Sequence, residues 1–327
     1  MKFTTPTTLP SGAPRIGLHS RVMLLGSCFA EGVGQRLKDN LPEGHVMSNP
    51  FGVLYNPMSM ATVLSGLLDG HLPTETMLFA GTDRLWHSLL HDGSFSAASK
   101  SESLDKIERQ FEAACHFLRK TDVLCLTWGT SMCYRHKVTG LIAANCHKQP
   151  AITFDSFDST PEEIAAIYKP LLNRLWQLRP DLKVVLTVSP YRYLKYGLHG
   201  SALTKARLLL AADTLEQTLE AVRYFPAYEI VTDELRDYRF YAADMVHPSE
   251  QASDYVLEQF KTWCFSDDLT AFAKDKTALL RARQHRPLHP DSPAYRDFVA
   301  SMAAAQAVFY EDWRNKGLNK EETTIIG

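Results

Sequence analysis

The stretch VMLLGSCFAEGVGQRL, residues 22–37, joins a strand pattern to a helix pattern through one sharp turn. It opens with four apolar residues, as in a strand buried on both faces. Gly26 then permits a tight turn. Beyond it Phe29, Val33 and Leu37 recur every four positions, the spacing of one helix face. In open α/β sheets, ligands bind at the carboxyl ends of the strands, so the stretch predicts both a fold class and a candidate site.

Two side chains that can act as nucleophiles, Ser27 and Cys28, follow this glycine. At a helix start, unpaired N–H groups and the positive end of the dipole lower the pKa of a thiol and stabilise an oxyanion. In the alternative interpretation, Ser27 only caps the helix and Cys28 is a small buried residue. A base elsewhere in the chain would favour the catalytic interpretation.

A candidate base lies in AADMVHPSE, residues 242–250. Asp244 and His247 are three positions apart, with a proline and a polar helix start after them. In a D-x-x-H loop the carboxylate fixes the imidazole tautomer while the other ring nitrogen faces a nucleophile. The pair therefore predicts an activated nucleophile at the end of the last strand–helix unit.

The rest of the chain alternates short apolar runs with longer amphipathic ones. The predicted strands are 21–25, 45–47, 122–128, 182–188 and 228–232. The predicted helices lie around 29–41, after the capping box TPEE (160–163), over 208–222 and over 252–260. This alternation predicts right-handed βαβ units and a doubly wound, flavodoxin-like parallel sheet between helical layers, an α/β fold.

Strand patterns stop after about residue 265, and the remainder indicates a helix, a proline-containing connector and a second helix. Phe298, Met302, Ala305 and Phe309 form an apolar stripe on the last helix. We expect an α/β domain over residues 1–265 and a helical extension over 266–327 that packs on it. A dimer contact is the alternative role for the stripe.

Composition and net charge indicate which kinds of partner the protein has. The 327 residues carry a net charge of −2, with 45% hydrophobic and 22% charged residues. We therefore expect no nucleic-acid or membrane partner. The start of the chain lacks the pattern of a signal peptide, and the six scattered cysteines suit free thiols in a reducing cytoplasm. Nothing in the sequence indicates the oligomeric state.

The blocks LLGSCFAE (24–31), SNPFGVLYNP (48–57), LTWGTSMCY (126–134) and AANCHKQP (143–150), with the D-x-x-H region, resemble the GSCFA family. The resemblance covers roughly residues 18–265. That family is similar to a branch of the SGNH/GDSL hydrolase-like superfamily, which implies a three-layer α/β/α fold and acyl-ester chemistry.

The superfamily resemblance implies a nucleophile two positions after the glycine that follows the first strand. That position is Cys28, and Ser27 stands where an aspartate is usual. Cys28 is therefore favoured over Ser27, with His247 as base and Asp244 as its orienting carboxylate.

The resemblance also implies oxyanion donors after the second and third strands. Gly52 matches the glycine after the second strand. Gly129 and Ser131 occupy the third motif, where the superfamily has G-x-N, so a serine replaces the usual asparagine. Three asparagines are candidates to complete the oxyanion hole: Asn49, Asn56 and Asn145.

Several polar residues are candidates for substrate binding. They are Trp86, His87, Asn145, His147 and Arg192. Packing at the surface is the alternative role for Trp86 and His87, and support of a helix end is the alternative for Arg192.

The cysteines and histidines at 133, 136, 146 and 147 have poor spacing for zinc, so we expect no metal. The sequence has no phosphate-binding loop and no dinucleotide glycine motif, so we expect no nucleotide cofactor. Coenzyme A needs no such motif and is considered as an acyl donor.

Three functions remain open. The first is hydrolysis of an acyl ester, with an acylated carbohydrate as a candidate substrate. The others are acyl transfer from coenzyme A to a hydroxyl, and binding of a carbohydrate or metabolite without catalysis. Two departures from the family pattern bear on the choice, the serine at 131 and a tyrosine, Tyr193, where we expect a family histidine.

Overall fold

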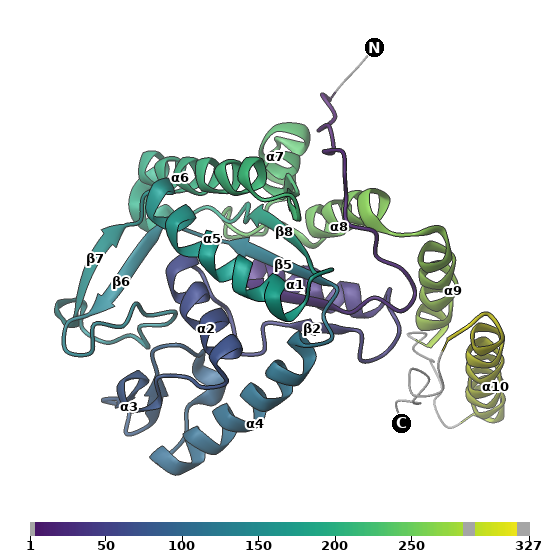
Figure 1. The fold of residues 1–327 in the computed structure, drawn as a ribbon. Coiled ribbons are helices and arrows are strands. Elements are labelled where there is room, and N and C mark those ends of the chain that lie inside the picture. Colours follow the sequence, from purple (N-terminus) through teal and green to yellow (C-terminus); the bar gives the residue numbers. More distant parts are fainter. Residues whose placement is uncertain (1–3, 284–291, 319–327) are drawn as a thin grey trace.

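The centre of the computed structural model, which describes residues 4–283 and 292–318, is a five-stranded parallel sheet of order β2-β1-β5-β8-β9 (Figure 1). This is the strand order of flavodoxin-like doubly wound folds, and it confirms the predicted fold class. The strands are β1 (Val22–Gly26), β2 (Val46–Ser48), β5 (Val123–Trp128), β8 (Lys183–Val188) and β9 (Val222–Tyr224).

Both faces of the sheet are covered, which explains its unbroken apolar strands. Successive side chains of a strand point to opposite faces. Met23 and Leu25 of β1 accordingly join one buried cluster, while Val22 and Leu24 join the other. A strand buried in this way cannot show the alternation of a half-exposed strand.

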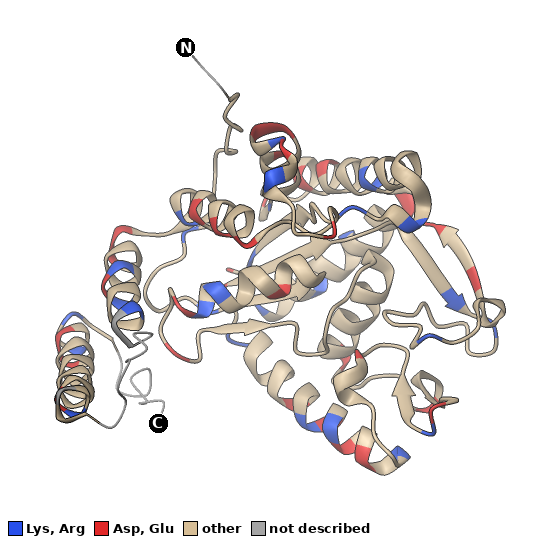
Figure 2. Ribbon diagram, turned by 180° about the vertical axis from the view of Figure 1, so that it is seen from behind, with Lys and Arg blue, Asp and Glu red and all other residues tan. Residues whose placement is uncertain are grey.

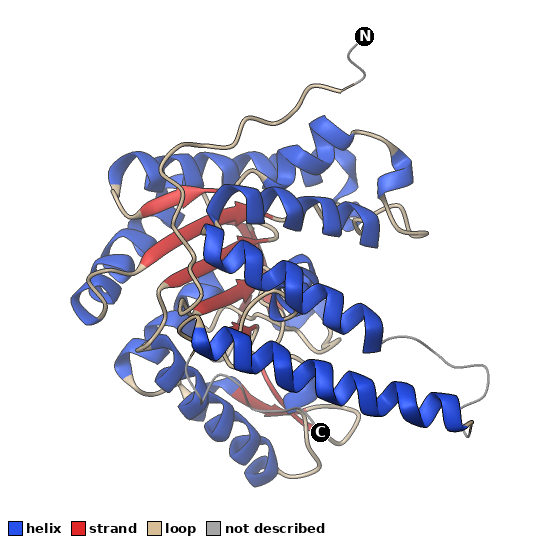
Figure 3. Cartoon of the chain, turned by 90° about the vertical axis from the view of Figure 1, so that its right-hand side faces the viewer, coloured by secondary structure: helices blue, strands red, loops and turns tan. Residues whose placement is uncertain are grey.

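Two helical layers enclose the sheet (Figures 1 and 3). The helices of the first layer are α2 (Pro57–Asp69), α4 (Lys100–Leu118), α5 (Pro161–Leu178) and α6 (Gly197–Thr218). Those of the second are α1 (Cys28–Lys38), α8 (Glu250–Cys264) and α9 (Asp267–Arg283). The predicted capping box is present, since Thr160 accepts from the Glu163 N–H and the Glu163 carboxylate accepts from the Thr160 N–H.

Two antiparallel hairpins and several short helical turns lie outside the main sheet. The hairpins pair β3 (Leu78–Ala80) with β4 (Trp86–Ser88), and β6 (Met132–His136) with β7 (Phe154–Asp158). The short helices are α3 (Thr74–Met77) and α7 (Ala227–Glu229), with a π-helix at Ile230–Leu235. Turns of 3₁₀ helix occur at Gly93–Phe95, Ala151–Thr153, Leu194–Tyr196 and Tyr238–Phe240.

The predicted fifth strand at 228–232 is wrong. Those residues form α7 and the start of the π-helix, and the fifth strand is β9. Helix α6 ends at Thr218, and Val222, predicted on a helix, pairs with Val184 at the sheet edge. The two short apolar runs are alike in length and character, and periodicity cannot separate a buried strand from a buried helical turn over so few residues.

The C-terminal helices α9 and α10 (Pro293–Asn315) lie side by side (Figure 3). The ring of Phe272 lies 5.4 Å from that of Phe309 and 5.1 Å from that of Trp313. Phe272 also belongs to the buried cluster that contains Ile16, so this pair of helices packs on the α/β core. The predicted connector lies mostly outside the described residues, and the domain boundary at 265 stays a prediction.

Acidic and basic residues are interspersed along the helices (Figure 2), as the small net charge leads us to expect. Within residues 4–283 and 292–318, no helix has both the length and the apolar character that crossing a membrane requires.

Candidate functional site

Cys28 is the first residue of α1 and lies at the carboxyl end of β1, the first strand. The turn before it is closely packed, since a Cβ on Gly26 would lie 2.5 Å from the Thr127 carbonyl oxygen on neighbouring β5. Glycine is therefore required at this position for steric reasons. The Cys28 side chain is half-buried, so it remains within reach of a small molecule.

The surroundings of Cys28 shift the pKa of its thiol in opposite directions. Burial is the largest effect and raises the pKa above its ordinary value, while the backbone N–H groups of Phe29 and Cys28 lower it. The positive charge of Lys205 lowers the pKa further, and the negative charge of Asp244 raises it. Burial prevails, so the resting thiol is protonated at neutral pH and its reaction needs a proton acceptor.

Ser27 lies deeper than Cys28. Its side chain is fully buried, and its Oγ has no hydrogen-bond partner within the described residues. The residue occupies the N-cap position of α1 but makes no side-chain capping bond, while its N–H donates to the Thr127 carbonyl at 3.3 Å. Of the two candidate nucleophiles, the structure leaves Cys28 the more accessible.

Asp244 and His247 form a hydrogen-bonded pair at the same end of the sheet. His247 Nδ1 lies 2.5 Å from one carboxylate oxygen of Asp244, and the other oxygen accepts the N–H groups of Val246 and His247 at 3.0 Å each. These bonds, the His247 N–H first, lower the pKa of Asp244 to about 2. Asp244 is thus ionised at neutral pH, and the geometry leaves His247 Nε2 on the other side of the ring.

Arg192 supports the loop that carries this pair. Its N–H donates to the Val246 carbonyl at 3.1 Å, and its guanidinium lies 3.4 Å from the Met245 carbonyl. The guanidinium also lies over the rings of Tyr238 and Tyr241, at 5.7 and 5.5 Å. Arg192 therefore contacts the loop of the Asp–His pair. Its predicted role in binding an anion stays a prediction.

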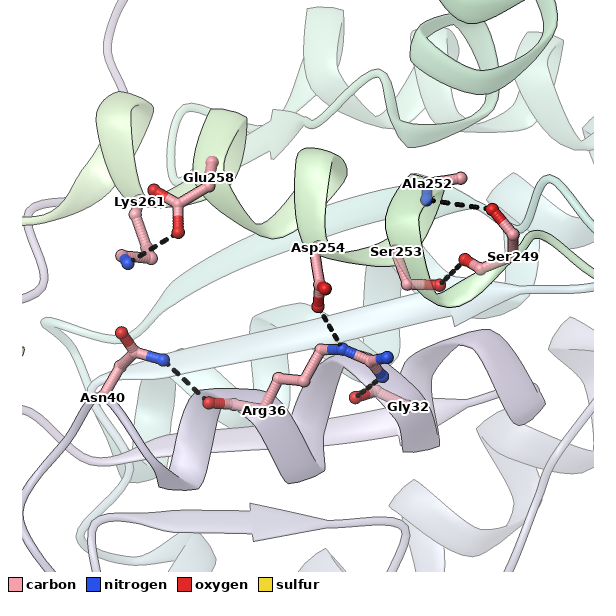
Figure 4. Close-up of polar contacts among 9 residues, drawn as sticks. All are labelled: Gly32, Arg36, Asn40, Ser249, Ala252, Ser253, Asp254, Glu258 and Lys261. Carbon is pink, nitrogen blue, oxygen red and sulfur yellow. Dashed lines mark hydrogen bonds and ion pairs between the residues drawn. The ribbon is translucent and has the colours of Figure 1, made fainter. Parts of the chain in front are cut away.

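Helix packing brings the two ends of the site together. Arg36 of α1 bonds to Asp254 of α8 at 2.6 Å, and Ser249 caps α8 by accepting the Ala252 N–H (Figure 4). Helix α1 starts at Cys28 and α8 starts three residues after His247. Holding these helices together therefore holds the two candidate segments at one edge of the sheet.

Tyr191 lies between the two segments. Its ring centroid is 4.4 Å from that of His247. Burial, then the charges of Cys28 and Asp244, raise its pKa. Cys28, Tyr191 and the Asp244–His247 pair therefore share one site. Within the described residues, no hydrogen bond joins His247 to Cys28 or to Ser27.

Three predicted oxyanion donors are already engaged. The Gly52 N–H donates to the Asn49 carbonyl at 2.9 Å, and the Gly129 N–H donates to the Tyr55 carbonyl at 2.8 Å. The Ser131 hydroxyl donates to Asp158 at 2.6 Å. Each group satisfies a contact that shapes its own loop, so none of the three presents a free donor in this structure.

Asn49 differs from these three residues. Its Oδ1 accepts the Gly26 N–H at 2.8 Å, which fixes the amide against the turn before Cys28. Its Nδ2 is buried and has no partner in the described part of the chain. Asn49 therefore keeps a free amide donor at the turn.

The residues proposed for substrate binding on β4 and in the loop after β6 form a cluster of their own. Asn145 accepts the His147 N–H at 2.8 Å, and His147 Nε2 lies 2.8 Å from the Ser88 carbonyl. The His147 ring stacks on His87 at 4.6 Å, and Lys100 lies 5.8 Å above the half-buried Trp86 ring. Among the described residues, no direct contact joins this cluster to Cys28, so its part in substrate binding stays a prediction.

Four residues near Cys28 were not identified as site residues from the sequence. They are Tyr55, Tyr191, Tyr193 and Lys205, each of which interacts electrostatically with Cys28. Burial, and then the charge of Cys28, raises the pKa of Tyr55 to about 12. The block SPYRY contains two of the tyrosines, and Lys205 shares a helix face with the core residue Leu208, which is the one signal that sequence offered for it.

No metal site accompanies these groups in the described residues, where no three His, Cys, Asp or Glu side chains gather closely enough to hold an ion. All six cysteines are free thiols.

Comparison with known proteins identifies the family. The model of the GSCFA family matches residues 21–260, and that of the GSCFA C-terminal domain matches residues 277–312. Similar solved structures include a carbohydrate esterase of family 3 from Talaromyces cellulolyticus, with 10% identity and a TM-score of 0.34 over 78% of this chain and 99% of that one. An acetyl esterase mutant with an acetate ion has 11% identity, the same TM-score and the same coverage. A comparison with curated proteins gives no match. Because the first family model spans most of the sequence, this chain belongs to the GSCFA family.

Proposed function

We propose that this protein hydrolyses an acyl ester through a covalent acyl-enzyme on Cys28, with His247 as general base and Asp244 as its orienting carboxylate. The observation that carries the proposal is the meeting of a half-buried thiol at a helix start with an Asp–His pair at one edge of the sheet. A nucleophile, a base and a group that orients the base are the three parts of such a site.

The chemistry would proceed in two displacements. His247 Nε2 takes the proton of Cys28 as Sγ bonds to the ester carbonyl carbon, and the protonated imidazole then gives that proton to the departing alkoxide. His247 next deprotonates a water, which attacks the thioester and releases the carboxylic acid. As the bond from Sγ to the carbonyl carbon breaks, the protonated imidazole returns its proton to the Cys28 thiolate. Asp244 stays ionised throughout and holds the Nδ1 proton.

The negative charge on the carbonyl oxygen needs donors during both steps. The N–H groups of Cys28 and Phe29 at the start of α1, together with the free amide donor of Asn49, are the candidates that the hydrogen-bond pattern supports. Loss of one such donor typically lowers a rate by about 10²–10³. Gly52, Gly129 and Ser131 are left out because their donors are engaged.

Acyl transfer to a hydroxyl is a second candidate reaction, and it uses the same groups. A thioester on Cys28 can be resolved by a hydroxyl in place of water, with His247 taking the hydroxyl proton. For hydrolysis, we propose an acylated carbohydrate as the substrate. For acyl transfer, we propose coenzyme A as the acyl donor.

Mass spectrometry of the intact protein tests the proposal. After brief exposure to p-nitrophenyl acetate at neutral pH, one acetyl group should be found on the peptide that carries Cys28. The adduct should be lost in Cys28→Ala and formed far more slowly in His247→Ala. Cys115→Ala removes a half-buried thiol of α4 and is the matched control, which should label as the wild type does.

Three other outcomes would contradict the proposal. Labelling of Ser27 in place of Cys28 would reverse the choice of nucleophile. If the labelling of Cys28 is unchanged in His247→Ala, His247 is not the general base. No adduct at all, together with sugar binding that persists in Cys28→Ala, would favour a binding protein.

A further inference from the structure

Lys205, a residue of α6, is a lysine that is only 2% exposed. A buried ammonium group is unfavourable unless polar groups surround it. Its Nζ donates to the Gly129 carbonyl at 2.5 Å and to the Ser189 carbonyl at 2.6 Å. These two residues follow the ends of β5 and β8, so Lys205 joins two central strands at the edge where Cys28 lies.

The contacts of Lys205 lead directly to the candidate site. Gly129, whose carbonyl it holds, is packed against Ser27, since a Cβ on Gly129 would lie 3.5 Å from the Ser27 Cβ. Lys205 Nζ also lies 5.0 Å from the ring of Tyr193. The ring of Tyr193 is 4.7 Å from that of Tyr191, which contacts His247.

We propose that Lys205, held by the Gly129 and Ser189 carbonyls, is a positioning residue that supplies a positive charge near Cys28 and thereby favours its thiolate. The inference rests on the proposed function for its catalytic meaning, but the effect on the thiol is independent of any ester. When the thiol ionises, its proton leaves to His247 or to solvent, while the bonds from Lys205 Nζ to the Gly129 and Ser189 carbonyls hold the lysine in place.

The positive charge of Lys205 is significant because the other groups that act on Cys28 are negative when they are ionised. Tyr55, Tyr191, Tyr193 and Asp244 each interact with Cys28, and as ionised groups all would be negative. His247 adds a positive charge only when it is protonated. Lys205 is the cation among the residues shown to act on Cys28, and it lowers the pKa of that thiol.

The two groups influence each other. Burial lowers the pKa of Lys205 to about 7, and the negative charge of Cys28 raises it. A thiolate therefore helps to keep the ammonium charged, and the ammonium helps to keep the thiolate. Such coupling is reciprocal, so it can be measured from either side.

The first experiment follows alkylation of Cys28 by iodoacetamide as a function of pH, with peptide mass spectrometry to identify the thiol. In Lys205→Met we expect the rate for Cys28 at pH 7 to fall about tenfold and the midpoint of the profile to move to higher pH. Lys205→Arg should restore much of the rate because it retains the charge. Cys115 in the same molecules is the internal reference and should not change.

Lys276→Met is the matched control variant. Lys276 Nζ also donates to two backbone carbonyls, of Lys38 at 2.8 Å and Leu41 at 2.5 Å, and burial also lowers its pKa. The charges that act on it are those of Asp39 and Glu43, not that of Cys28. This variant loses an equivalent structural contact and should leave the profile of Cys28 unchanged.

Lys205→Gln separates the charge from the hydrogen bonds, because its amide has two donors for the two carbonyls. It carries the test should Lys205→Met fail to fold.

An unchanged Cys28 profile in folded Lys205→Met or Lys205→Gln would overturn the inference and leave Lys205 a structural residue. These results are distinct from failure of the proposed function. If the wild-type protein forms no acyl-enzyme but its Cys28 alkylation profile depends on Lys205, the inference about Lys205 stands and the proposed esterase activity is refuted.

Discussion

The glycines of residues 26–34 provide a test of the structure that does not depend on function. A Cβ on Gly26 would lie 2.5 Å from the Thr127 carbonyl oxygen, 2.7 Å from the Thr127 Cβ and 3.0 Å from the Ala30 Cβ. Ordinary contact begins near 3.4 Å, so the end of β1 and the start of α1 would have to move away from β5 by roughly 1 Å.

The magnitude for Gly26→Ala follows from two contributions. Overpacking a close contact between rigid backbone segments destabilises by about 1–3 kcal/mol. The same movement stretches the bonds from the Gly26 N–H to Asn49 and from the Ser27 N–H to Thr127, each worth about 0.5–1.5 kcal/mol. We expect the free energy of unfolding to fall by about 3 kcal/mol, in the upper part of the usual range for single substitutions.

Gly32→Ala is the matched control, six residues further along the same segment. It lies inside α1, and the nearest atom to an added Cβ is Arg36 Nη1 at an ordinary 3.5 Å. Alanine is favoured over glycine in a helix interior by about 0.5–1 kcal/mol, so this variant should be more stable than the wild type.

Urea denaturation followed by circular dichroism measures both variants, and an unchanged slope shows that the unfolded state is the same. The steric reasoning is refuted if Gly26→Ala lies within about 0.5 kcal/mol of the wild type. A Gly32→Ala variant as unstable as Gly26→Ala would refute it as well, since the loss would then belong to the segment and not to the contact.

Three further predictions concern the site and its surroundings. Asp244→Asn replaces the acceptor of the His247 Nδ1 proton by a donor, which selects the wrong tautomer; acyl-enzyme formation should slow by about 10²–10⁴ with little change in thermal stability. Arg192→Met removes the guanidinium that lies against the Met245 carbonyl and should lower kcat/KM with p-nitrophenyl acetate about tenfold. Unchanged kinetics would show that the loop keeps its conformation without Arg192. Ser131→Ala leaves Asp158 without its buried donor and should destabilise by about 1–3 kcal/mol in urea while acylation proceeds normally; lost acylation in a stable Ser131→Ala would return that hydroxyl to the oxyanion hole.

The sheet could be predicted from the sequence because its central strands are buried on both faces. Residues 122–128 and 182–188 are nearly unbroken apolar runs, and the helices between strands begin with recognisable caps such as Thr160. The edge strand β9 has only three residues and could not be distinguished from the neighbouring run at 228–232. A strand that pairs on one side alone carries a correspondingly weak signal.

The candidate nucleophile and its Asp–His pair were recognisable because their local spacing carries chemical meaning. The donors around them were not, because a backbone N–H looks the same in sequence whether it is free or bonded. Gly52 and Gly129 have the positions expected of oxyanion donors, yet their N–H groups close loops onto Asn49 and Tyr55. Lys205 was missed for a related reason, since a lysine on a helix is usually exposed and only its place in line with Leu208 marks it as buried.

The protonated resting state of Cys28 determines what the base has to do. A thiol that is ionised at rest attacks without a base, whereas here burial outweighs the helix start and the charge of Lys205, so a proton must leave as the substrate is attacked. His247 can take that proton only while its Nδ1 proton is held, and Asp244, with a pKa lowered to about 2, holds it across the whole neutral range. Because Asp244 stays ionised as the pH falls below neutral, protonation of Asp244 cannot account for a loss of activity there.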